Sequence, residues 1–212
     1  MGSLLYPLYT VANFGLAIWS IDLLQQSNNG NIFLLILVIA GMIYDNLIIS
    51  LGRLINEGIH LELLNRLRFF LHDILIPLLL VVAVKLASAA GVVWATQSLV
   101  SSGSWGIALG LITFGVVVNS KHLELTPTNY AGILRYKPKK SYVPILTIFT
   151  ALIVGVAGFY IWREIQWPWM FVGTVVMFVG NAFPTKIVGP LLGSAVDLIF
   201  IFALVLTQIN VY

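Results

Sequence analysis

Long continuous runs of apolar residues alternate with short polar connections along the whole chain. Each run approaches the length of about 20 residues that a helix needs to cross the hydrocarbon core of a bilayer. Within the runs apolar residues follow one another without alternating, which favours helices over the strands of a membrane barrel. The expected helices cover residues 4–24, 32–54, 69–94, 104–120, 142–162, 168–183, which is short, and 187–211. The pattern predicts an all-α, polytopic membrane bundle of seven transmembrane helices.

The two longest connections differ in pattern. In the connection over 55–68, Ile59, Leu63 and Leu67 recur near one helical face, which predicts a short helix lying on the membrane surface. The connection over 121–141 contains proline and glycine and has no clean period, so it is interpreted as a loop.

Composition supports a single integral membrane domain over 1–212. The chain is 59% hydrophobic and 9% charged, against about 25% charged residues in a typical soluble domain. It has no cysteine, which excludes disulfides and thiolate metal sites. The net charge of +3 does not predict a nucleic-acid partner, because the basic residues are distributed by membrane side.

The basic residues lie mainly in the connections after the second, fourth and sixth helices. These connections hold nine of the eleven lysines and arginines. Because basic connections stay on the cytoplasmic side, or the stromal side of a plastid membrane, the N-terminus is predicted to be cytoplasmic and the C-terminus outside. The composition fits a plasma membrane or an organellar, thylakoid-type membrane equally well.

Helices one to three can be aligned with helices five to seven, with the fourth helix as a linker. Both halves would begin on the same side, so the alignment suggests a parallel repeat of three, one and three helices. The matched positions are Pro7 and Pro144, Asn46 and Asn181, and Asp73 and Asp197. This plan resembles that of the small sugar-transporter family. None of that family's motifs is found, however, and the N-terminus is expected on the opposite side, so no family is assigned.

Ionisable residues inside the expected helices are the main candidates for function. A charged side chain at mid-membrane costs about 2.5 to 3.5 kcal/mol, so such residues normally face the bundle interior. At 1.5 Å per residue, Asp45 lies roughly 13 Å and Asp197 roughly 15 Å from the cytoplasmic end of their helices. Asn46, Ser50 and Arg53 share one helical face. These residues are therefore expected to meet at one depth.

Further polar groups fall in the same half of the membrane. His72 and Asp73 begin the third helix, and Asn181 lies in the inner part of the sixth. The sequence therefore predicts a polar chamber open to the cytoplasm. Its expected ligand-binding residues are Asp45, Asn46, Arg53, His72, Asp73, Asn181 and Asp197.

Structural roles compete with this hypothesis. Arg53 can form an ion pair with Asp45 or Asp73 that ties two helices together, and buried asparagines often link membrane helices through hydrogen bonds. Lys85 and Asp22 are expected at one depth outside the chamber, where a structural pair is the simpler interpretation.

Several chemistries are not supported by the sequence. It has no HExxH zinc motif, no glycine-rich phosphate loop and no GxSxG nucleophile motif. No cofactor can be named. Three functions remain open: a carrier or channel for a small polar or cationic solute, an intramembrane enzyme acting on a lipid or isoprenoid, and a structural or pigment-binding subunit of a membrane complex. The expected partners are membrane lipids and a small-molecule or lipid ligand, with a homo-oligomer or a larger membrane complex left open.

Overall fold

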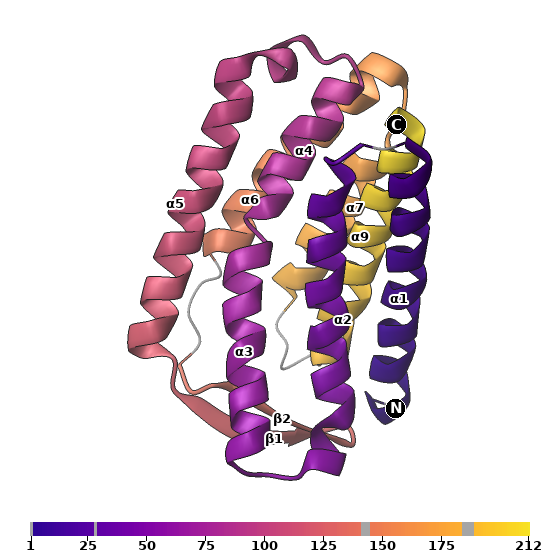
Figure 1. The fold of residues 1–212 in the computed structure, drawn as a ribbon. Helices are drawn as coiled ribbons and strands as arrows, with labels where there is room; N and C mark the ends of the chain where they lie inside the picture. The colour runs from indigo at the N-terminus through magenta and orange to yellow at the C-terminus, as the bar shows by residue number, and fades with distance from the viewer. Residues whose placement is uncertain (1, 28, 141–144, 184–188) are drawn as a thin grey trace.

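The computed structural model describes residues 2–27, 29–140, 145–183 and 189–212, and it shows a long helical bundle with a β-hairpin at one end (Figure 1). We call this end the hairpin end. The N-terminus lies there and the C-terminus lies at the opposite end. The elements are α1 (Gly2–Ser27), α2 (Ile32–Ile55), α3 (Ile59–Leu75), α4 (Leu78–Ala89), the 3-10 turn η1 (Val93–Thr96), α5 (Ser98–His122), β1 (Leu125–Tyr130), β2 (Ile133–Pro138), α6 (Ile145–Ile165), α7 (Trp169–Ala182) and α9 (Pro190–Val211).

The predicted all-helical architecture is confirmed, but the predicted number of spanning helices is not. Within the described residues, six helical segments are long and apolar enough to cross a membrane, with α3 and α4 together forming one of them. The remaining apolar helix, α7, has 14 residues and is therefore about 21 Å long. That is shorter than the roughly 30 Å hydrocarbon core of a bilayer.

The prediction of a short surface helix over 55–68 is wrong. α3 begins at Ile59 and is continued by α4 after a bend, so this segment is the hairpin-end part of one spanning unit (Figure 1). Leu61 is fully buried and packs with Ile48 of α2 and Leu134 of β2, which draws the segment into the bundle. The bend follows Ile76, because Pro77 has no N–H to continue the hydrogen-bond ladder.

The connection over 121–141, expected as a loop, contains an antiparallel hairpin. β1 and β2 pair from Leu125 opposite Pro138 to Tyr130 opposite Ile133. The turn between them, Ala131 and Gly132, has φ angles of 49° and 86°, as a two-residue type I′ turn requires. A side chain on Gly52 of α2 would collide with a backbone carbonyl of β2, so the hairpin packs directly against the end of that helix.

The apolar core occupies the half of the bundle away from the hairpin. Nine residues of the 12-residue α4 are buried, which makes α4 its central helix. α4 packs against α2, α6 and α9, whereas α5 lies at the edge and contacts α3, α4 and η1. The outer surface is rich in exposed apolar side chains such as Leu4 and Leu99, as expected for contact with lipid. The chain therefore has the build of an integral membrane protein.

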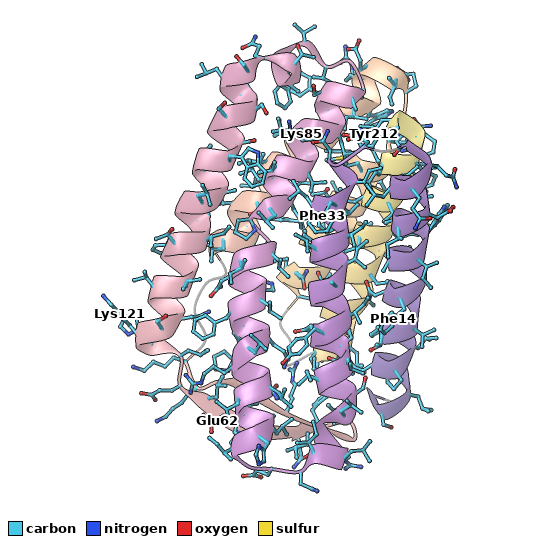
Figure 2. The ribbon with its side chains drawn as sticks, viewed as in Figure 1. Phe14, Phe33, Glu62, Lys85, Lys121 and Tyr212 are labelled. Atoms are coloured by element: carbon cyan, nitrogen blue, oxygen red, sulfur yellow. The ribbon has the colours of Figure 1, made fainter. Side chains whose placement is uncertain are left out.

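Charged side chains lie towards both ends of the bundle. Figure 2 shows Glu62 and Lys121 at the hairpin end, and Lys85 near Tyr212 towards the other end. Arg66 contacts Glu62 at 3.2 Å, and Lys139 contacts Glu124 at 3.3 Å. Which end faces the cytoplasm stays a prediction from the basic residues.

Candidate functional site

Two adjoining cavities lie among α2, α3, α4, α6, α7 and α9. The first has a volume of about 240 Å³ and the second about 270 Å³. We call them the first and second lobes of a chamber, because they share wall residues. The shared residues are Met42, His72, Ile76 and Asp197.

The polar wall of the first lobe is built around Arg68. Its Nε donates a hydrogen bond to Asp45 Oδ1 at 2.8 Å, and its Nη1 donates to Asn65 Oδ1 at 2.6 Å. Asn65 Oδ1 also accepts the backbone N–H of Tyr136 at 3.2 Å, which links this network to the hairpin. The guanidinium lies 5.5 Å from the centre of the Phe69 ring. The charge of Asp45 is thus compensated inside the chamber.

Arg53 does not have the predicted role. It is exposed near the end of α2, and no ion pair joins it to Asp45 or Asp73. Arg68 takes its place as the partner of Asp45. Sequence reasoning missed Arg68 because it assigned residue 68 to a surface connection, although Asn65, Arg68 and His72 have the i, i+3, i+7 spacing of one helical face.

Asn46, one of the expected ligand-binding residues, lines the first lobe from a buried position with 2% exposure. Its Nδ2 donates to the Met42 carbonyl at 2.9 Å. Because that carbonyl can only accept, the bond identifies the other amide atom as the oxygen. This Oδ1 has no hydrogen-bond partner.

Asp197 and Asn181 come from α9 and the last turn of α7. Asn181 Nδ2 donates to Asp197 Oδ1 at 3.0 Å, and both residues line the second lobe. Thr150 of α6 lines the same lobe, and its buried Oγ1 has no partner. Among the described residues no cation contacts the Asp197 carboxylate closely enough to form an ion pair.

The side chains of His72 and Asp73 point to different sides of α3. His72 lines both lobes, whereas Asp73 lines neither. Asp73 is 6% exposed and accepts a hydrogen bond at Oδ2 from Asn119 Nδ2 of α5. Successive helical side chains point about 100° apart, and here the Asp73 side chain points towards α5 while His72 faces the chamber. Of these two expected ligand-binding residues, only His72 therefore lines the chamber.

The structure does not confirm the internal repeat. Asn181 is hydrogen-bonded to Asp197, but the matched Asn46 bonds within its own helix and the matched Asp73 bonds to α5. Pro144 lies outside the described residues.

Arg135 of β2 is a polar group near the chamber that the sequence assigned only to a basic connection. It is half-buried, and its Nε has no partner. Burial lowers the pKa of its guanidinium below the ordinary value, and the nearby Tyr6 opposes this shift. Arg135 lines neither lobe. Its position reflects the hairpin, which sequence reasoning did not predict.

The described residues contain no group of three histidine, aspartate or glutamate side chains placed to hold a metal ion. No family model, no curated protein and no solved structure matches the chain.

Proposed function

We propose that the protein is a carrier for a small cationic solute, which binds in the chamber. The observation that supports this best is that Asp45 and Asp197, from α2 and α9, line one lobe. Arg68 compensates Asp45 only. With His72 neutral and Asp197 ionised, the groups that line the first lobe carry one net negative charge, which a bound monocation would balance.

Interrupted helices around the chamber support a carrier further. Carriers often build their solute sites from discontinuous helices near the middle of the membrane. Here Ile76, at the break between α3 and α4, lines both lobes, and the short helix α7 contributes Asn181 from its last turn.

The apolar core supports access from one side at a time. Leu79, Phe200 and Ile201 line the second lobe. They also belong to the apolar core, which fills the half away from the hairpin. Solute would then enter from the hairpin half. The basic residues predict that this half is cytoplasmic, and a single cysteine in place of Lys139 should label from that side, since the chain has no other cysteine.

Reconstituted protein provides the test. Currents or uptake in proteoliposomes should respond to small organic cations and not to neutral or anionic analogues of similar size. Asp197→Asn removes the uncompensated charge and should abolish the response. Asp22→Asn should preserve it, because Asp22 is exposed on α1 and contacts Gln26. Equal responses of all three proteins, or a response independent of solute charge, would contradict the proposal.

A second candidate function, an intramembrane enzyme on a lipid, has one observation in its favour. An apolar groove of about 480 Å³ lies between α6 and α7, and Ala151 lines both this groove and the second lobe. An acyl chain in the groove could place its headgroup near Asn181 and Asp197. Conversion of a lipid by the detergent-purified protein, without flux in proteoliposomes, would favour this function.

A further inference from the structure

One residue that lines the first lobe has a buried hydrogen-bond acceptor without a donor. Asn46 Oδ1 has no partner, although Asn46 lines the lobe together with the carboxylates of Asp45 and Asp197. A buried polar atom without a partner has lost its hydrogen bonds to water and has gained none in return, which is unfavourable. A ligand that donates at this position would therefore recover a contact that the protein itself does not make.

Hydrogen-bond capacity in the lobe separates classes of cation. An ionised carboxylate only accepts hydrogen bonds, and an amide oxygen also only accepts. Asp197 Oδ1 already accepts from Asn181, which leaves Oδ2 and Asn46 Oδ1 available for donors. A primary ammonium has three N–H donors, whereas a quaternary ammonium has none.

The scarcity of aromatic rings in the first lobe also argues against a quaternary ammonium as the ligand. Proteins usually hold such cations in cages of aromatic rings. Among the described residues, Phe69 supplies the one phenyl ring on the wall of the first lobe, and the Arg68 guanidinium already lies against it.

We propose that the chamber recognises a protonated primary amine, whose ammonium group donates to Asn46 Oδ1 and to the Asp197 carboxylate. This inference rests on the proposed function, since it names the class of cation that the carrier would bind. Asn46 is the specificity-determining residue, because it distinguishes a donor cation from one that carries the same charge without N–H groups.

Binding to the purified, full-length chain in detergent tests the inference with three probes of equal chain length: butylamine, butyltrimethylammonium and butanol. Butylamine should bind at least 10-fold more tightly than butyltrimethylammonium, since a hydrogen bond to a charged group contributes about 1.5 to 3 kcal/mol. Butanol should bind more weakly than either cation. Equal affinities for the two cations would overturn the proposal.

Asn13 of α1 provides a matched control. It is also buried, donates through Nδ2 to a carbonyl one turn earlier at 2.8 Å, and has an unpartnered Oδ1, but it does not line the chamber. Asn46→Leu should remove the preference for butylamine, whereas Asn13→Leu should preserve it. If Asn46→Leu fails to fold, the affinities of the unaltered chain for the two cations still test the proposal. Loss of the preference in Asn13→Leu, or its retention in Asn46→Leu, would overturn the proposal.

Failure of this inference can be told apart from failure of the proposed function. Uptake of another cation without binding of butylamine would overturn the inference and leave the carrier intact. Selective binding of butylamine without flux of any cation would overturn the carrier and support the amine site.

Discussion

Two aspartate–asparagine pairs hold neighbouring helices together in this bundle, and their surroundings are opposite. At the contact of α3 with α5, Asn119 donates to Asp73, which is buried and lines no cavity. At the contact of α7 with α9, Asn181 donates to Asp197, which lines both lobes of the chamber. The same two residue types therefore make the same bond in a packed contact and on a cavity wall.

The difference shows why an acid inside the membrane is not by itself evidence for a binding site. Gly115 lets α5 approach α3 so closely that an added side chain would lie 3.0 Å from Asp73, so no ligand can reach this acid from α5. Asp197 has no such cover and remains accessible from the chamber. We therefore interpret the first pair as structural and the second as functional.

Loss of the asparagine should give the largest difference between the two pairs. Asn119→Leu leaves a buried carboxylate without its donor and should lower the free energy of unfolding by about 1 to 3 kcal/mol. The melting temperature should then fall by about 2 to 12 °C. Asn181→Leu should cost about 1 kcal/mol or less, because water in the chamber can solvate Asp197. Thermal unfolding in detergent measures both. A larger loss for Asn181→Leu would reverse our assignment of the two roles.

Closer packing at the α3–α5 contact predicts a smaller effect. Gly115→Ala would place a methyl group 2.7 Å from Leu146 and 3.0 Å from Asp73, so it should destabilise the protein by about 1 kcal/mol or more. Gly110→Ala on the same helix meets nothing within 4 Å and should stabilise it by about 0.5 to 1 kcal/mol, because alanine is the better helix former. Equal melting temperatures would mean that α5 is not held tightly against Asp73.

The smallest expected effect concerns pH and leaves stability unchanged. His72 faces the chamber beside Asp197, and the ordinary pKa of histidine is about 6.5. His72→Gln should therefore change the pH dependence of binding or uptake, because glutamine does not titrate. His60→Gln should not, because His60 is exposed at the start of α3 and lines neither lobe. An unaltered profile in His72→Gln would exclude His72 from the solute step.

Residues far apart in the sequence show what could be predicted about the site. Asp45 and Asp197 were expected at one depth from helix length alone, and they line one lobe. Depth follows from counting residues at 1.5 Å each, which needs no tertiary information. The direction of each side chain depends on where neighbouring helices pack. For that reason the sequence grouped Asp73 with His72 and chose Arg53 over Arg68.

The apolar pattern alone determined that the chain is a helical membrane bundle, because a backbone in lipid must satisfy its own hydrogen bonds. Tertiary structure decided the rest. In the hairpin, the consecutive residues Ile133 and Leu134 are both buried against α1, α2 and α3. They therefore lack the alternation of apolar and polar residues that predicts a half-exposed strand. Leu61 and Asn65 also contact the hairpin, and the helix that carries Arg68 is longer than the sequence predicted. These contacts join residues separated by tens of positions in the sequence, and local periodicity does not specify which of them meet.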